Sequence, residues 1–495
     1  MRTYSFLVVC ISILISSCQP GKKLKSSNFT YSVLIDTINS KKNAPALQSF
    51  IHGVKGNDWL LFGGRSNTQK NSSFGGLHQA VKYIPNTPTD SIKKTNNDYA
   101  YFSFPCKSFN PHMYVYNVKK DSIDSINIFK IFHVIDSISN GEIKIPFQSF
   151  VNTNALARQY DDDLYILGGY GPESSEECSP KTGSYTAHYK TNNYFMKLNV
   201  PFWINAIKKY KNKDTWELAK YIIEEISYSS PIVYGKSDYI ASTGAELFKI
   251  KDIFYVVGGQ NYYETDTITI KDKDTTETTS FKKYPYLTSV RAFKATIKLP
   301  HIFKFDIDST LSPISDVNRS SFGTQHADTI SIFRRRDVTI TPTFFNDLNN
   351  QGVIFHGGVF KSNGKEAGKG PFFGWDNALF IHPNIKTNEK FFSTSQDDDL
   401  YNLKNIYACA TFVGYDDNSK NVYSFLMGGI GDGKQDYWLS GFTKSVTTVK
   451  QPLTNFAQNT TVKQDDLGFN PPNNKFYGAE AVFIYNNDAS LKFRE

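Results

Sequence analysis

Apolar residues recur along this chain in short runs that each end in a pair of glycines. Four or five mostly apolar residues followed by glycine are typical of a buried strand, because such a run is too short to form a helix. The unit occurs five times, which indicates a repeat fold whose units bury their apolar faces against one another. With their glycines, the runs span residues 59–64, 164–169, 254–259, 353–358 and 423–429.

Further strands are predicted on both sides of these runs. Residues 155–160 are followed by three aspartates and then by the run that begins at Leu164, which predicts a hairpin. Four antiparallel strands per unit are typical of a propeller blade. We expect third strands at residues 112–118, 193–198 and 301–306, and fourth strands at residues 125–133 and 330–334.

This succession of strands, with Gly-Gly after the second strand and an aromatic residue before Asn or Asp in a later one, resembles the kelch repeat over residues 47–485. The resemblance implies an all-β fold, a kelch-type β-propeller with its blades in one domain. The first glycines of the five pairs lie 71 to 105 residues apart, whereas a kelch blade has about 50 residues. Each blade therefore carries an insertion.

The insertions are expected on one face, because connections alternate between the two faces of an up-and-down blade. Loops gathered on a rigid scaffold are common binding sites. The alternative is disordered decoration, which the polar residues 271–279 fit best. The insertions comprise residues 65–111, 170–192, 260–300 and 359–376.

Residues 477–485 repeat the pattern of residues 242–248 and begin a sixth blade, although no glycine pair follows them. We expect six blades of four antiparallel strands, with an incomplete sixth that residues 30–35 complete. The domain is expected to span residues 28–495. The chain also resembles large uncharacterised kelch lipoproteins of Gram-negative bacteria, a resemblance that implies a fold and a location but no activity. It rests on residues 63–67, 76–78, 167–171, 243–248, 334–338 and 478–483.

The first residues form a separate segment. Arg2 precedes an apolar run at residues 6–15, and small residues then lead to Cys18. This arrangement resembles a bacterial lipoprotein signal, which implies a signal peptide at residues 1–17, lipidation of Cys18 and a flexible tether at residues 18–27. The expected location is the cell envelope, as an outer membrane lipoprotein that faces the periplasm or the surface. The alternative is an ordinary secretory signal with an incidental cysteine.

Charge and cysteine content narrow the possible partners. The formal net charge is +8 over 495 residues, with no sustained basic stripe, so nucleic acid is not an expected partner. Cys106 and Cys178 are candidates for a disulfide, whereas Cys409 lies in an apolar stretch and is expected to be a buried thiol. No zinc-binding spacing of cysteines or histidines occurs, and neither a metal nor another cofactor is expected.

The candidate ligand-binding residues are few. An arginine fork suits a carboxylate or phosphate, and two carboxylates near one axis suit acid–base chemistry or a cation. The alternatives are structural: the arginines hold blades together, the glutamates cap backbone N–H groups, and the histidine is an ordinary loop residue. The candidates are Arg65 and His78 in the first insertion, Arg334, Arg335 and Asp337 before the fourth inner strand, and Glu246 and Glu480 in two Gly-Ala-Glu segments.

These features predict a lipid-anchored binding or assembly module for a glycan, a peptide or an envelope protein. The alternative is a carbohydrate-modifying enzyme of the epimerase or oxidase type, with its site at the channel mouth and catalytic residues that the sequence does not identify. Kelch-like propellers include enzymes of both types, and fold analogy is the only support for this alternative.

Overall fold

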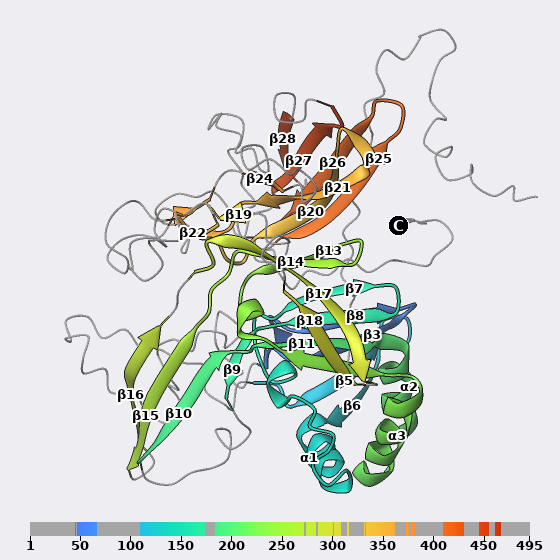
Figure 1. Ribbon diagram of the computed structural model, residues 1–495, viewed down its shortest axis with the longest axis vertical. Helices are drawn as coiled ribbons and strands as arrows, with labels where there is room; N and C mark the ends of the chain where they lie inside the picture. The colour runs from blue at the N-terminus through green and yellow to red at the C-terminus, as the bar shows by residue number, and fades with distance from the viewer. Residues whose placement is uncertain are drawn as a thin grey trace, which may run out of the picture.

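The computed structural model describes most of the region between residues 45 and 466, and the described residues are mostly in β-strands (Figure 1). The strands form a succession of antiparallel sheets, and three α-helices pack beside the first of them. The described residues are 45, 47–66, 109–173, 184–271, 274–283, 286–299, 301–307, 314–315, 331, 333–361, 373–375, 378–381, 409–429, 445–454 and 461–466.

Five units follow one another along the chain, and each begins with the predicted hairpin. In every unit the second strand ends at a glycine pair, as the sequence pattern predicts. The first unit is β2 (Ile51–Lys55), β3 (Asp58–Phe62), β5 (His112–Asn117) and β6 (Ser122–Asn127). The second is β7 (Leu156–Tyr160), β8 (Asp163–Leu167), β11 (Tyr194–Asn199) and β12 (Ile232–Lys236).

The third unit is β13 (Glu246–Ile250), β14 (Ile253–Val257), β17 (Ser289–Leu299) and β18 (Ile302–Asp306). A parallel contact between Tyr234 of β12 and Ile302 of β18 joins it to the second unit, and β19 (Ile314–Ser315) pairs with β17. The fourth unit has β20 (Thr339–Phe345), β21 (Asp347–His356) and β24 (Ala378–Ile381). The fifth has β25 (Ala410–Asp416), β26 (Asn421–Met427), β27 (Ser445–Pro452) and β28 (Thr461–Asp466).

Insertions of the second and third units form a sheet of their own. It contains β9 (Tyr170–Pro172), β10 (Ser184–Thr191), β15 (Tyr263–Lys271) and β16 (Asp274–Lys283), in the order β16-β15-β10-β9, and it projects from the body at the lower left of Figure 1. Lys271 and residues 274–279 therefore lie in paired strands, and for these residues the expectation of disordered decoration is wrong. Shorter pairs join β1 (Leu47–Gln48) to β4 (Arg65–Ser66) and β22 (Val359–Lys361) to β23 (Phe373–Gly374).

The helices are α1 (Ile128–Ile138), α2 (Val200–Tyr210) and α3 (Thr215–Tyr228), with short 3-10 turns η3 (Phe147–Ser149) and η5 (Asp238–Ile240) elsewhere. The expected strand at residues 125–133 is wrong in its second half, because the Asn127 side chain accepts the Lys130 N–H and caps α1. The strand expected at residues 301–306 is present but is the fourth of its unit. Residues 331, 333 and 334, within the fourth strand expected at 330–334, are not in a strand. In the described part of the chain, no helix is long and apolar enough to cross a membrane.

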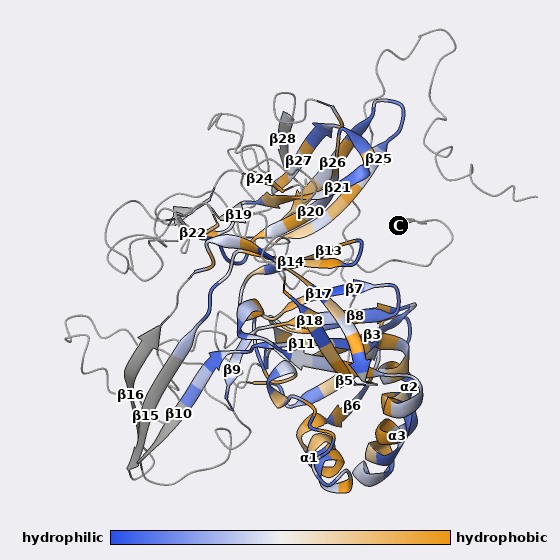
Figure 2. Ribbon diagram, viewed as in Figure 1, coloured by the Kyte–Doolittle hydropathy of each residue, from blue (hydrophilic) through white to orange (hydrophobic). Residues whose placement is uncertain are grey.

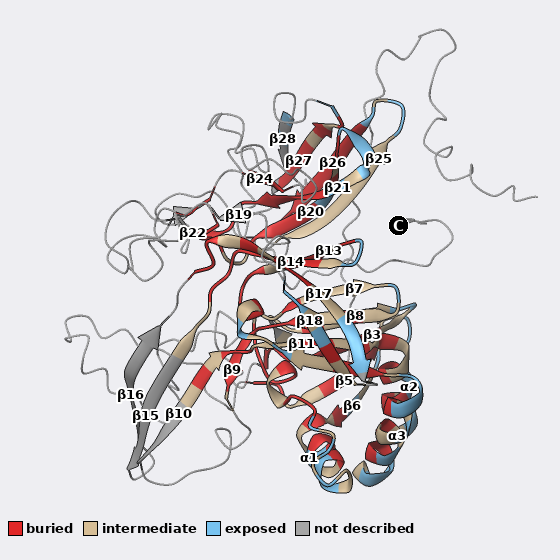
Figure 3. Ribbon diagram, viewed as in Figure 1, coloured by how far each residue is buried: buried red, intermediate tan, exposed pale blue. Residues whose placement is uncertain are grey.

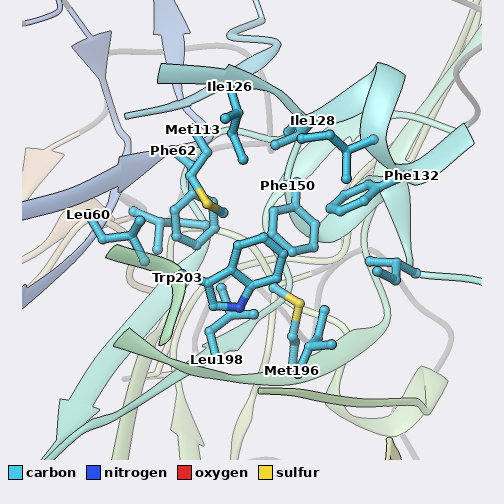
Figure 4. Close-up of a cluster of buried hydrophobic side chains, with 14 of the residues drawn as sticks. Leu60, Phe62, Met113, Ile126, Ile128, Phe132, Phe150, Met196, Leu198 and Trp203 are labelled. Atoms are coloured by element: carbon cyan, nitrogen blue, oxygen red, sulfur yellow. The ribbon is translucent and has the colours of Figure 1, made fainter. Parts of the chain in front are cut away.

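The largest hydrophobic core lies between the helices and the first two units. Trp203 of α2 is fully buried and packs among Phe62, Phe150 and Met196 (Figure 4). Its indole N–H donates to the carbonyl of Pro231 at 3.1 Å, which satisfies the polar atom inside the core. The helices turn apolar, buried residues toward this core and polar, exposed residues outward (Figures 2 and 3).

Three of the glycine pairs connect their unit to the next one. All ten glycines have positive φ, and the N–H of Gly169 donates to the carbonyl of Ser242, in the segment that precedes the third unit, at 3.0 Å. In the same way, the N–H of Gly64 donates to the carbonyl of Asn152, and the N–H of Gly259 donates to the carbonyl of Arg335. Because the positive φ and so close an approach leave no room for a Cβ at Gly168, glycine serves the packing of the units at this junction.

Candidate functional site at the inner strands

The first strands of successive units begin side by side. Ser49, Asn154, Gly244 and Asp337 each lie two residues before such a strand, and all four have φ between 52° and 64°. Gly244 N–H donates to the carbonyl of Asn154 at 3.1 Å, and Asp337 N–H donates to the carbonyl of Gly244 at 2.9 Å. These bonds bring the strand starts of the second, third and fourth units together.

An arginine–glutamate pair joins two of these strands. Arg158 of β7 donates from Nη2 to Oε2 of Glu246 on β13 at 2.8 Å, and from Nε to the carbonyl of Leu247 at 3.2 Å. The Arg158 side chain remains 40% exposed and the Glu246 side chain 21%. The predicted candidate Glu246 is therefore paired across two units and still reaches solvent.

The surroundings of Glu246 change the pKa of its carboxyl group. Burial raises its pKa above the ordinary value, while the charge and hydrogen bond of Arg158 lower it and the nearby charge of Asp337 raises it. A partly exposed carboxyl group with a perturbed pKa is a candidate for a functional site.

His52 lies in β2 of the first unit, and the charge of Arg158 acts on it. Burial, reinforced by the charge of Arg158, lowers the pKa of His52 to about 4, so that its imidazole is neutral near pH 7. Its ring lies beside those of Phe50 and Trp59, with centroids 6.1 and 6.5 Å away. We define the paired residues Arg158 and Glu246 as the inner-strand site.

A second pair lies at the strand starts. Arg336 Nε is 2.7 Å from Asp337 Oδ2, and Asn154 Nδ2 donates to Asp337 Oδ1 at 3.2 Å. The Asp337 side chain is only 7% exposed and that of Arg336 is 22% exposed. The predicted candidate Asp337 thus links the second and fourth units, and its charge acts on Glu246.

The other arginines of the cluster lie in the interior. Arg335 is fully buried, donates from Nη1 to the carbonyl of Gly357 at 2.9 Å and stacks on Trp375, whose ring centroid is 4.1 Å from Cζ. Arg334 is buried beneath Tyr286, with its Cζ 4.3 Å from the ring centroid. This geometry favours the structural interpretation of both arginines over ligand binding.

Arg65 is also buried and lies in β4, where its backbone pairs with that of Gln48. The remaining sequence candidates, His78, Glu480 and the lipidation site Cys18, lie outside the described residues, as do Cys106 and Cys178. Cys409, expected to be buried, is half-buried, with its Sγ 3.3 Å from Thr339 Oγ1. No group of three possible metal ligands occurs within the described ranges.

The sequence did not single out His52 or Arg158. Aligning the first strands of the units places His52 and Arg158 within two positions of the level of Glu246. The hairpins carry that signal, but the unequal spacing of the glycine pairs obscures it.

His356 is a buried polar residue with a structural role. Its Nε2 is 2.8 Å from Thr341 Oγ1, which also accepts a hydrogen bond from Ser424 Oγ of the fifth unit at 2.9 Å. Complete burial lowers the pKa of His356 to about 3. The neutral ring thus helps to join the fourth unit to the fifth.

This burial predicts a pH effect on stability. A histidine whose pKa is lower in the folded state stabilises the fold above the unfolded value near 6.5, and this contribution is lost as the pH falls toward 3. We expect the difference in unfolding free energy between wild type and His356→Gln to change by about 1.4 kcal/mol per pH unit in this range. Urea unfolding at pH 7, 5.5 and 4.5 measures it. His52 titrates in both proteins, so parallel pH profiles would contradict the role of His356.

Comparison with known proteins gives little information beyond this geometry. No known protein family and no curated protein matches the chain. Among solved structures, one titled "Structure of YjhT" aligns with 86% of this chain and 100% of its own, at 10% sequence identity and a TM-score of 0.27. A TM-score this low carries no argument about fold or activity, so the function is inferred from the inner-strand site itself.

Proposed function

We propose that this chain is a kelch-type β-propeller of six blades, anchored in the cell envelope through Cys18, that binds a glycan, a peptide or an envelope protein at its inner strands. Five successive units with a common strand order support the propeller, and the shared sheet of two insertions supports a common loop face. The N-terminal sequence supports the anchor.

One observation carries the binding function. Arg158 and Glu246, from neighbouring units, form an ion pair that stays partly exposed, and Nη1 of Arg158 and Oε1 of Glu246 bond no described residue. Side chains that only fasten units together use their hydrogen-bonding capacity on each other. Gln159 does so, since its side chain bonds both the N–H and the carbonyl of Val54, at 2.7 and 2.8 Å.

The test is a binding screen with full-length protein purified in detergent, on arrays of immobilised glycans and peptides. We expect Arg158→Met to weaken binding of any retained ligand at least tenfold. Lys55→Met is the matched control, because Lys55 forms an exposed ion pair with Asp162 at 2.6 Å that also joins the first two units. Equal loss in the two variants would contradict a site at Arg158.

A second candidate function is a carbohydrate-modifying enzyme, and the titration of the site favours it specifically. The pKa of Glu246 is raised, which moves this carboxyl group toward the neutral range in which a general acid works, whereas the pKa of His52, about 4, is moved away from that range. Conversion of an array ligand, followed by NMR, distinguishes the enzyme from a binding module, because binding alone leaves the ligand unchanged.

A further inference from the structure

A short tripeptide recurs in this chain independently of its repeated units. Aspartate is followed by serine or threonine ten times, and isoleucine comes next in seven of these ten cases. Isoleucine makes up less than a tenth of the chain, so composition alone would put it after one of the ten pairs at most. The seven tripeptides begin at Asp36, Asp90, Asp121, Asp124, Asp136, Asp266 and Asp328, of which the first two and the last lie outside the described residues.

The four described tripeptides have different backbone conformations. The first begins at Asp121, in the turn before β6, with φ of 47°. Residues 124–126 lie inside β6, residues 136–138 form the end of α1, and residues 266–268 lie inside β15. A cap or a turn requires one local conformation wherever it occurs. Local structure therefore does not explain why this tripeptide recurs.

The aspartates of the tripeptides also have no common structural role. Asp121 Oδ1 accepts a hydrogen bond from the Tyr116 hydroxyl at 2.8 Å, and Asp124 Oδ1 pairs with Lys211 Nζ at 2.6 Å. The Asp136 side chain bonds no described residue and lies in the last turn of α1, where the helix dipole disfavours a carboxylate. Stability of the fold therefore does not account for an aspartate at all three positions.

An accessible hydroxyl group is what these tripeptides share. Ser122, Ser125 and Ser137 are all exposed, and none of their hydroxyls bonds another residue in the described part of the chain. They lie on β6, the last strand in the sheet of the first unit, and on α1, which follows it (Figure 1). An exposed hydroxyl in a fixed sequence context is what a modifying enzyme requires of its acceptor, as Asn-X-Ser/Thr is for N-glycosylation.

We propose that Ser122, Ser125 and Ser137 are acceptors for an O-linked glycan, attached by a glycosyltransferase that recognises Asp-Ser/Thr-Ile. The donor is a sugar activated by a phosphate ester at its anomeric carbon. The serine Oγ bonds that carbon, the bond from the carbon to the phosphate oxygen breaks, the phosphate leaves with the electron pair, and the hydroxyl proton passes to a base. The modification is distinct from the binding function proposed above and does not depend on the inner-strand site.

The aspartate before each serine favours a sugar over a phosphate. A phosphate group would add a charge of about −1.5 to −2 at pH 7 beside an existing carboxylate, whereas an uncharged sugar adds no repulsion. The position on β6 also gives the glycan an effect, because β6 pairs only with β5 among the described strands. A bulky hydrophilic group at this edge would hinder pairing with a strand of another molecule.

The experiment is mass spectrometry of full-length protein purified from the cells that naturally produce it. Trypsin is expected to release residues 121–130, with two of the acceptors, and residues 131–144, with the third. We expect sugar masses on both peptides, located by fragmentation at Ser122, Ser125 and Ser137, and none on protein made by cell-free translation. Ser227 is exposed on α3 but follows isoleucine, and we expect it to stay unmodified.

A variant tests the recognition of the aspartate. Asp136→Asn keeps the acceptor hydroxyl and is expected to lower the modified fraction of Ser137 at least tenfold, while Ser122 and Ser125 keep theirs. Glu224→Gln is the matched control, because it neutralises an exposed carboxylate on α3 outside any such tripeptide and should change none of the three fractions. Thermal unfolding of both variants verifies that they are folded.

Three results would overturn the proposal. The first is an unmodified mass at all three serines in protein from its natural source, and the second is a mass that a phosphatase removes. The third is a modified fraction of Ser137 that Asp136→Asn leaves unchanged. The glycan and peptide arrays test the binding function separately, so its failure would leave this modification unaffected.

Discussion

Gly168→Ala is expected to lower the free energy of unfolding by about 4 kcal/mol, because a methyl group has no room at this junction between units. A Cβ at residue 168 would lie 1.8 Å from the carbonyl oxygen of Ser242, which is backbone and cannot rotate away. The residue also has φ of 67°, a conformation that costs a non-glycine residue about 1–2 kcal/mol. Relief of the clash would break the bond from Gly169 N–H to the same oxygen.

Gly56→Ala is the matched control for this substitution. Gly56 has φ of 61°, close to that of Gly168, but a Cβ there would meet no atom within 4 Å. Its expected cost is therefore the conformational part alone, about 1–2 kcal/mol. Chemical denaturation of both variants measures the difference. Equal losses would mean that the second unit does not pack against the third as closely as the structure has it.

The strands that end at the glycine pairs could be predicted from the sequence. A short apolar run before paired glycines carries its structural information locally, because the strand and the positive φ that ends it depend on adjacent residues. The second strands β3, β8, β14, β21 and β26 were therefore predicted within a residue or so at their glycine ends. The strand order within the units followed from the same hairpins.

The helices were missed for a different reason. Residues 128–138 contain isoleucine and phenylalanine, which also suit strands, and the helix is decided by the Asn127 cap and by buried residues at positions 128, 131, 132 and 135. Their helical spacing was visible in the sequence. The strand assignment prevailed because a propeller blade required a fourth strand there.

The inner-strand site could be predicted only in part. Glu246 was a candidate because Gly-Ala-Glu occurs twice, but its partner Arg158 lies 88 residues earlier, in another unit. No local pattern connects residues that far apart when the units have unequal lengths. Charge density in the sequence instead favoured residues 334–336, where a flat guanidinium can be buried against an aromatic ring.

Arg335 and Arg158 therefore provide opposite tests. Arg335→Met is expected to lower the free energy of unfolding by about 3 kcal/mol, because it removes a buried donor to the Gly357 carbonyl and the stacking on Trp375. Arg158→Met should change stability by no more than about 1 kcal/mol, since its ion pair is partly exposed.

The effects of the two substitutions on ligand affinity should be the reverse of their effects on stability. Arg335→Met, assayed below its lowered unfolding temperature, is expected to retain wild-type affinity because its side chain is fully buried and does not reach the site. Arg158→Met, although folded, should lose at least tenfold. Denaturation and array binding on the same preparations give both readouts. If Arg335→Met were stable and lost binding, the cluster at residues 334–337 would contain the ligand site, and the interior arginine would have to become accessible when ligand binds.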